Sequence, residues 1–491
     1  MRCLNVKAVA AAIGPSKYGD CVMDFPTFNE ELHRVVSQDP ELDSLPLETI
    51  LDSIPRVDEL TDLPPGATVL VRADLDMPVK DGKVADMSRI EADSQTIKYC
   101  NERGWKTVMF GHIGRDKDNS LAPVREAMSA HVGLPIDLVE DWLDEGNGRL
   151  TDEFVEKVER AAAGSIFMLQ NTRKYSIEQA LWEVGEENFR AVSERMYAAG
   201  ADIRARLTSI EVNEAMAASN VDFSSSALPL LMSRTALGFY ITEEMKTFIK
   251  GARRSNFVVF SGLKINKLDD LEGVVDRGGL IRIITAGSLA MALLKARAQL
   301  DGRDFFIGLA ETDPSQKAYI EPGRIEQAKG IVGKCDEQGI DLVLPLDFVL
   351  DNGEVSSVIP EGRAQMDIGP ETRALFARKV RDYIEASKRA AEPYAMFYNG
   401  VFGKFEDPRF EGGTKFFISL LKEMTEGGVS TYVGGGEGSL ALHKYGSQED
   451  ATHVFTSGGT VLKSLTNKHI AFLKAMYIQN TRERAAKGET R

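Results

Sequence analysis

The sequence predicts an α/β fold of two doubly wound, Rossmann-like lobes, each built on a parallel sheet and joined by a hinge helix. Short apolar runs alternate with longer amphipathic runs from about residue 66 to residue 466, a pattern typical of βα units. The chain has 491 residues, enough for about three domains or two large ones. One amphipathic segment near the middle separates the pattern into two halves.

Eight short runs rich in Val, Ile and Phe are the candidate strands, because buried parallel strands are nearly continuous in apolar residues. In chain order they are Ala67–Arg72, Thr107–Gly111, Ser165–Leu169, Phe257–Ser261, Leu280–Thr285, Leu342–Pro345, Ala395–Tyr398 and Val429–Gly434. Segments 89–104, 288–299 and 370–390 carry apolar residues at helical spacing and end near Gly or a basic residue. They are therefore expected to be helices.

The remaining segments define the expected domain organisation. Residues 1–60 are acidic, punctuated by proline and poor in strand signals, which indicates an accessory extension. The amphipathic segment 236–254 ends in a glycine and a basic pair and is the expected interdomain helix. It separates an N-terminal lobe, residues 61–235, from a C-terminal lobe, residues 255–467, and residues 468–491 form a helical tail.

Composition excludes several classes of protein. Acidic residues outnumber basic ones by 74 to 59, a formal charge of -15, which disfavours a broad nucleic-acid-binding face. No window offers about 18 uninterrupted apolar residues, so no transmembrane span is expected. Cys3, Cys21, Cys100 and Cys335 are too far apart for a C-x-x-C motif and fit a reducing, cytoplasmic compartment. Motifs of zincins, α/β-hydrolases and P-loop NTPases are absent.

The segment TYVGGGEGSLALHKYG, residues 431–446, carries the sharpest local signal. An apolar strand runs into Gly434–Gly438 and then into a helix, and such a turn presents backbone N–H groups and a helix N-terminus to a nucleotide phosphate. Glu437 suits a bridging Mg²⁺ there, because Mg²⁺ is commonly held by one carboxylate and by phosphates. A tight βα turn with Glu437 as a helix cap explains the segment equally well.

A second signal is FVVFSGLKINK, residues 257–267, in which a strand delivers Lys264 into the following loop. A lysine at the carboxyl end of a strand can reach a phosphate in the crevice where open α/β sheets bind ligands. A solvated surface lysine is the ordinary alternative, since most lysines are exposed.

The first half of the chain places cationic side chains after several strands. These loops also carry two aspartates, Asp74 and Asp76, which could hydrogen-bond the hydroxyls of a ligand. Because parallel strands end at one edge of a sheet, the basic residues could converge on a single anionic ligand; they are Arg72, Arg89, His112, Arg115 and Arg173.

Nine segments in order resemble the signature segments of the phosphoglycerate kinase family over about residues 66–465. They are VLVRADLDMPVKDGKVADMSRI, VMFGHIGRD, FMLQNTRKY, VVFSGLKINK, LDIGPETRALF, FYNGVFGKFE, GGT, YVGGGEGSLAL and HVFTSGGTVL. The resemblance implies that the N-terminal lobe holds 3-phosphoglycerate or 1,3-bisphosphoglycerate and that the C-terminal lobe holds ATP or ADP with Mg²⁺. It also implies closure about a hinge.

The resemblance implies roles for particular residues. Asp74 and Asp76 fall on the family's substrate-binding Asp and Asn. The family's basic patch corresponds, beside Arg72, to Arg89, His112, Arg115 and Arg173. Lys264 falls on the family's first nucleotide-side lysine. Asn399 and Glu406 fall on nucleotide-contacting positions, and Gly435, Gly436, Glu437 and Gly438 on the phosphate turn. Arg89 and Lys264 are thus the expected catalytic residues, and Glu437 the expected metal ligand.

Four positions depart from the family pattern. Asp76 replaces an amide, Val221 replaces an arginine of the patch, Leu268 replaces a second lysine and Gly438 replaces a threonine. Lys267, one position before Leu268, is the obvious substitute for the lost lysine.

The expected function is that of an ATP-dependent phosphoglycerate kinase in glycolysis or gluconeogenesis, acting as a monomer with no nucleic-acid or membrane partner. The departures leave two alternatives. One is a catalytically impaired, nucleotide-binding relative, and the other is a kinase for another carboxylate substrate.

Overall fold

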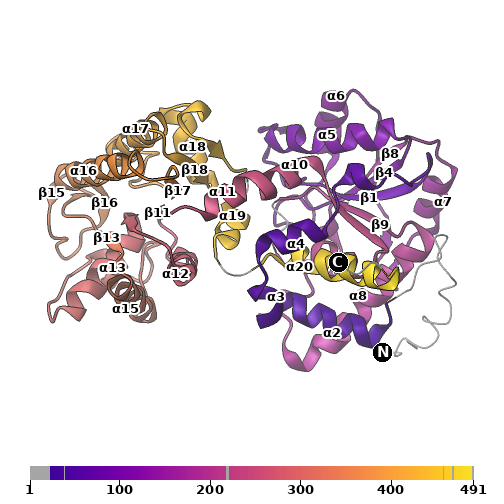
Figure 1. Ribbon diagram of the computed structural model, residues 1–491, viewed down its shortest axis with the longest axis horizontal. Helices are drawn as coiled ribbons and strands as arrows, with labels where there is room; N and C mark the ends of the chain where they lie inside the picture. Colours follow the sequence, from indigo (N-terminus) through magenta and orange to yellow (C-terminus); the bar gives the residue numbers. More distant parts are fainter. Residues whose placement is uncertain (1–22, 38, 217–219, 457, 467–468, 489–491) are drawn as a thin grey trace. The chain divides into compact units, whose positions relative to one another are not determined.

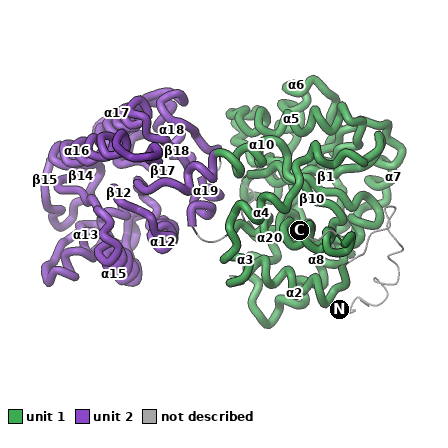
Figure 2. The backbone as a smooth tube through the Cα atoms, in the orientation of Figure 1, with its two compact units in different colours: residues 1–247, 468–491 green, residues 248–467 purple. Residues whose placement is uncertain are grey.

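The computed structural model describes residues 23–37, 39–216, 220–456, 458–466 and 469–488 (Figure 1). The chain divides into two compact units, one of residues 1–247 with 468–491 and one of residues 248–467 (Figure 2). Each unit has its own parallel sheet and its own apolar core. No described helix is both long enough and apolar enough to cross a bilayer.

The described part of unit 1 contains a six-stranded sheet in the order β10-β9-β1-β4-β8-β5, with every neighbouring pair parallel. Its strands are β1 (Thr68–Arg72), β4 (Lys106–Phe110), β5 (Ile136–Val139), β8 (Ile166–Leu169), β9 (Ile210–Asn213) and β10 (Arg234–Leu237), and two short hairpins join β2 (Val79–Lys80) to β3 (Lys83–Val84) and β6 (Leu143–Asp144) to β7 (Arg149–Leu150). Three strands predicted from apolar runs are confirmed as β1, β4 and β8.

Helices accompany this sheet and bury its apolar strands. They are α2 (Phe25–Val36), α3 (Pro40–Ser44), α4 (Leu47–Ser53), η1 (Val57–Glu59), α5 (Ser88–Glu102), α6 (Ala122–Val132), α7 (Asp152–Arg160), η2 (Thr172–Lys174), α8 (Glu186–Arg206), η3 (Phe223–Ala227), α9 (Leu228–Leu231), α10 (Phe239–Glu243) and α20 (Ala471–Ala486). The central strand β1 is almost wholly buried, as a strand of a parallel sheet covered on both faces should be.

The acidic extension forms helices, and these pack as part of unit 1. Asp24 and Asp39 cap α2 and α3 by accepting backbone N–H bonds within the first turn, which satisfies donors that a helix start leaves free. Phe28 and Leu32 are fully buried in the same cluster as residues of α8 and α20. The C-terminal helix α20 therefore belongs to unit 1, beside α2 and α4 (Figure 1). Residues 1–22, with Cys3 and Cys21, lie outside the described residues.

The predicted start of the interdomain helix, at residue 236, is wrong. Residues 234–237 form the edge strand β10, and helical structure runs only from Phe239, through α10, η4 (Glu244–Ile249) and α11 (Lys250–Arg253). Gly238 separates strand from helix, because the Glu214 carboxylate occupies the space that a side chain at 238 would fill. That carboxylate accepts the backbone N–H of Tyr240 and of Ile241 at 3.1 Å and so caps α10.

Unit 2 has a second six-stranded parallel sheet among its described residues, in the order β13-β12-β11-β17-β18-β19. Its strands are β11 (Phe257–Phe260), β12 (Arg282–Thr285), β13 (Asp341–Val343), β17 (Ala395–Asn399), β18 (Ser430–Gly434) and β19 (His453–Val454), and a small antiparallel sheet holds β14 (Phe348–Leu350), β15 (Val355–Ser356) and β16 (Gln365–Ile368). Its remaining helices are α12 (Lys267–Arg277), α13 (Gly287–Leu300), α14 (Leu309–Thr312), α15 (Pro322–Glu337), α16 (Pro370–Ser387), α17 (Gly412–Glu426), α18 (Gly436–Tyr445), η5 (Gln448–Asp450) and α19 (Gly458–Ser464). The five strands predicted here, β11 to β13, β17 and β18, are confirmed.

Candidate active site

The basic residues of unit 1 follow the carboxyl ends of its central strands. Arg72 is the last residue of β1, His112 lies just after β4, and Arg173 lies in η2 after β8. Arg89 stands at the start of α5. Because β1, β4 and β8 are parallel neighbours, their following loops share one edge of the sheet, as expected for a ligand site in an α/β fold.

Arg72 is the buried hub of this edge, with only 1% of its surface exposed. Its Nε donates to Ser224 Oγ at 2.9 Å, its Nη1 donates to the carbonyl of Ala73 at 2.8 Å, and its Nη2 lies 3.1 Å from His112 Nδ1. The guanidinium is thus engaged with the protein. These contacts suit Arg72 to positioning His112 more than to binding a ligand directly.

Arg89 is held by the two aspartates that follow β1. Its Nη1 donates to Asp74 Oδ1 at 2.8 Å and to the Asp76 carbonyl at 2.6 Å. The Asp76 carboxylate accepts the N–H of Gly114 at 2.7 Å and lies 3.7 Å from His112 Nε2. The His112 contact, the Gly114 N–H and the charge of Arg89 hold the pKa of Asp76 well below its usual range despite burial. Asp76 is therefore an anion beside the cationic groups.

Arg173 has a different setting. Its Nη1 donates to the carbonyl of Gly114, and its guanidinium carbon lies 5.3 Å from the centre of the Trp182 ring. The indole N–H of Trp182 in turn donates to Asp222 Oδ1 at 2.7 Å. Arg115, by contrast, is exposed and is the basic residue of this group most open to solvent.

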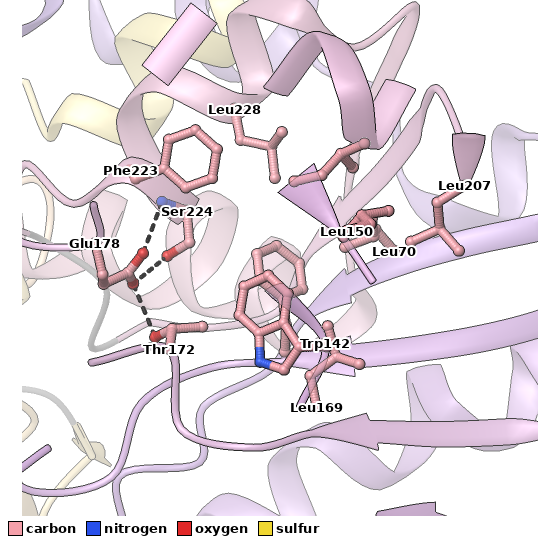
Figure 3. A pocket seen from close by; sticks show the side chains of 12 residues that line it. Leu70, Trp142, Leu150, Leu169, Thr172, Glu178, Leu207, Phe223, Ser224 and Leu228 are labelled. Atoms are coloured by element: carbon pink, nitrogen blue, oxygen red, sulfur yellow. Dashed lines mark hydrogen bonds between the residues drawn. The ribbon is translucent and has the colours of Figure 1, made fainter. Parts of the chain in front are cut away.

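Glu178 is a second buried acid on this side of the sheet. Its carboxylate accepts Thr172 Oγ at 2.9 Å, Ser224 Oγ at 2.6 Å and the Ser224 N–H at 3.1 Å (Figure 3). The void beside it has a volume of about 10 Å³, close to the minimum that holds one water molecule. This void is therefore too small for a substrate.

Unit 2 contains a cleft of about 710 Å³, a size that suits a nucleotide. Much of its wall is apolar, formed by Leu263, Met291, Ile307, Leu309, Val401 and Phe402. Glu406 and Glu437 line the same cleft. An apolar wall with a few polar groups is the usual character of a small-molecule site.

The glycine-rich turn borders this cleft between β18 and α18. Gly435 adopts a φ of +92°, and a Cβ there would lie 2.6 Å from Asn399 Nδ2, so the position requires glycine. Asn399 Nδ2 donates to the Gly434 carbonyl at 2.7 Å and fixes the turn. Helix α18 begins at the next residue, Gly436, so its free N–H groups can serve an anion at the turn.

Lys267 reaches this turn, whereas Leu268 does not. Lys267 Nζ donates to the Ser261 carbonyl at 2.9 Å and lies 3.6 Å from Glu437 Oε2, while Leu268 is 0% exposed. Burial lowers the pKa of Lys267, and the positive charge of Lys264 adds to this effect, against the attraction of Glu437. Lys264 itself is exposed.

A magnesium ion fits the residues at this turn. The Glu437 side chain is 43% exposed at the start of α18 and faces the nucleotide-sized cleft. One accessible carboxylate beside a phosphate pocket is the donor set that Mg²⁺ uses when substrate phosphates complete its coordination.

The structure thus brings together most of the residues expected from the sequence, in two groups. One holds Arg72, Asp74, Asp76, Arg89, His112 and Arg173 in unit 1, and the other holds Asn399, Glu406, Gly435, Gly436, Glu437 and Gly438 in unit 2. Trp182 and Glu178 were missed, because neither lies in a recognisable motif. Residues 174–189 carry several acids and several aromatics, so no signal in the sequence distinguishes Glu178 and Trp182 from their neighbours.

A family model described as phosphoglycerate kinase matches residues 60–468. A phosphoglycerate kinase of Bifidobacterium adolescentis is 30% identical over 433 residues, 84% of this chain and 97% of the relative, and one of Thermosipho africanus is 28% identical over 426 residues, 82% and 94%. Solved phosphoglycerate kinases of Coxiella burnetii and Pyrococcus horikoshii match its fold with TM-scores of 0.64 and 0.66 at 22% identity, covering 87% of this chain and 99% and 100% of theirs.

Proposed function

The chain belongs to the phosphoglycerate kinase family, and we propose that it transfers a phosphoryl group between Mg-ATP and the carboxylate of 3-phosphoglycerate, reversibly, through the two sites described above. The observation that carries this proposal is in unit 2, where a nucleotide-sized cleft, a glycine-rich helix start and the ammonium of Lys267 meet. Such an arrangement supplies positioning and charge stabilisation, which are the main needs of phosphoryl transfer.

In unit 1, Arg89, His112 and Arg173 would bind the anionic substrate. Arg89 is fixed by Asp74 and by the Asp76 carbonyl, so its guanidinium is oriented before a ligand arrives. Preorganised cations of this kind stabilise the charge that develops on the transferred group without reorganisation during the reaction. Arg115, which is exposed, is free to turn toward the same ligand.

In unit 2, the N–H groups at the start of α18 would hold the nucleotide phosphates, and the Lys267 ammonium would face the transferred phosphoryl group. Glu437 would hold Mg²⁺, which neutralises phosphate charge when bound. Lys264, which is exposed and precedes α12, would complete the set. A cytoplasmic location and a monomeric state stay predictions of the sequence.

A second candidate function is that of a nucleotide-binding relative with impaired activity or with another carboxylate substrate. The observation that favours it is the number of acids near the cationic groups of unit 1. Asp76, Glu178 and Asp222 stand close to the cationic groups there, and acids oppose the binding of an anion.

Calorimetry and a coupled assay together separate these functions. We expect wild-type protein to bind ADP more tightly with Mg²⁺ than without, and Glu437→Gln to lose most of that difference. We also expect ADP release from ATP only when 3-phosphoglycerate is present. Lys415→Ala, which removes an exposed lysine on α17, is the matched control. Magnesium-dependent ADP binding without turnover of 3-phosphoglycerate would favour the second candidate.

A further inference from the structure

We propose that Trp182 and Asp222 are positioning residues for Arg173 in the substrate site of unit 1. The inference rests on the proposed function, because it assigns a role in binding 3-phosphoglycerate. Its basis is a chain of three contacts: Asp222 accepts from the Trp182 indole, the Trp182 ring faces the Arg173 guanidinium, and Arg173 donates to Gly114.

The ring of Trp182 gives the guanidinium a platform. The guanidinium carbon of Arg173 lies 5.3 Å from the ring centre, within the range at which the electron-rich face of an indole attracts a cation. Arg173 is itself buried, and its Nε has no hydrogen-bond partner among the described residues. Stacking against the indole therefore restricts the guanidinium without consuming the N–H groups that an anion would bind.

Asp222 fixes the indole. It is fully buried just before η3, and its Oδ1 accepts the Trp182 N–H at 2.7 Å. Trp182 lies in an irregular stretch between η2 and α8 and is 46% exposed, so packing alone does not set its orientation. A hydrogen bond to a buried carboxylate supplies that constraint.

The residue at position 221 explains why the orientation of Arg173 matters in this chain. Val221 stands where the family resemblance leads one to expect another arginine, and it lies directly before Asp222. With one cation fewer, more of the binding of an anionic substrate depends on Arg173. An element that holds Arg173 ready lowers the entropy lost on binding, which is the usual benefit of preorganisation.

The test is the dissociation constant of 3-phosphoglycerate, measured by calorimetry, together with the KM for each substrate. We expect Trp182→Ala to weaken 3-phosphoglycerate binding and raise its KM by roughly tenfold, between the losses expected for an exposed and for a desolvated cation–π contact. Its KM for ATP and its kcat should stay close to those of wild type, because the loss affects binding and the nucleotide cleft is in unit 2. Trp182→Phe keeps a ring and should lose no more than about threefold.

A double-variant cycle separates positioning from a structural effect. If Trp182 acts through Arg173, Trp182→Ala should change nothing further in an Arg173→Ala background, and Asp222→Asn, which retains an acceptor oxygen, should resemble Trp182→Phe. Independent, multiplying effects of Trp182→Ala and Arg173→Ala would overturn the inference, as would an equal rise in both KM values. Wild-type protein that binds no 3-phosphoglycerate would overturn the proposed function itself, and this inference with it.

Discussion

At the residue scale, Lys267 is the side chain that we propose to act in place of the lysine expected at position 268. Its ammonium lies 3.6 Å from Glu437 at the glycine-rich turn, while Leu268 is packed into the core of unit 2. The first residue of a helix, α12, can direct its side chain to the site, and the second faces inward. Position 268 therefore carries no lysine, but the Lys267 ammonium still places a positive charge at the turn.

Removal of that charge should slow the reaction. We expect Lys267→Ala to lower kcat by about 100- to 1000-fold, the usual cost of one preorganised donor at a developing charge, with ADP affinity little changed. Steady-state kinetics measure both, with Lys415→Ala as the control. An unchanged kcat would mean that Lys267 does not act on the transferred group. Leu268→Lys should not raise activity, because it would bury an unpaired charge in the core.

Glu211 makes the stability of unit 1 depend on pH. It lies within β9, is 1% exposed, and neither of its carboxyl oxygens has a hydrogen-bond partner among the described residues. Burial raises its pKa to about 8, helped by Glu178 and opposed by Arg72. The folded protein thus keeps this proton between about pH 4.5 and pH 8, where the unfolded chain releases it.

The consequence is that this group favours folding less as pH rises. Between about pH 5 and pH 8 the free energy of unfolding should fall by up to about 1.4 kcal/mol per pH unit from Glu211 alone. Glu211→Gln should flatten that slope and stabilise the protein at pH 8 relative to wild type. Urea titrations at pH 5, 6.5 and 8 measure it, and identical slopes for the two proteins would refute the assignment.

At the scale of elements, the N-terminal extension makes polar contacts with the C-terminal helix and with the residues just before it. Lys474 of α20 is 3% exposed, and its ammonium lies 2.7 Å from Asp43 Oδ1 in α3. His469 Nε2 contacts the Leu45 carbonyl at 2.7 Å, and Arg484 donates to the Ser53 carbonyl at 3.0 Å. The extension therefore contributes to the stability of unit 1 and is more than an appended segment.

Breaking the pair should reveal its contribution. Lys474→Ala takes the ammonium partner from Asp43, which keeps the backbone N–H of His469 at 3.2 Å. The loss should lower the free energy of unfolding by about 3 kcal/mol, the lower end for a largely buried pair that loses one member. Lys487→Ala at the C-cap of the same helix removes a more exposed pair with Glu483 and should cost under about 1 kcal/mol. Denaturant unfolding compares the two variants. Equal effects would show that burial does not govern the contribution of this pair.

Sequence patterns predicted the strands that are apolar throughout, and those strands position most of the candidate site. They did not predict β9 or β10. Glu211 interrupts the apolar run of β9, and the apolar end of β10, at Ala236 and Leu237, continues without a polar break into the segment expected to be helical. The expected helix starts at residue 236, inside β10, because the end of that strand and the start of the helix are both apolar. Trp182 and Asp222 were not foreseen as a pair, since 39 residues separate them in the chain and only the tertiary fold joins them.

For the whole molecule, the two proposed ligand sites belong to different units. Because 3-phosphoglycerate would bind unit 1 and the nucleotide unit 2, transfer requires the two ligands to come together, and domain closure is the usual means. We expect small-angle scattering to show a smaller radius of gyration with both ligands than with either alone. An identical radius under all conditions would argue against closure.

The central claim is that this chain phosphorylates the carboxylate of 3-phosphoglycerate, and trapping the acyl phosphate tests it most directly. Wild-type protein, ATP, Mg²⁺ and 3-phosphoglycerate are incubated with hydroxylamine, which converts an acyl phosphate to a stable hydroxamate. We predict hydroxamate and ADP in equal amounts, both dependent on 3-phosphoglycerate and both strongly reduced in Arg89→Ala and Lys267→Ala. Absence of hydroxamate from wild-type protein that still binds Mg-ADP would contradict the claim.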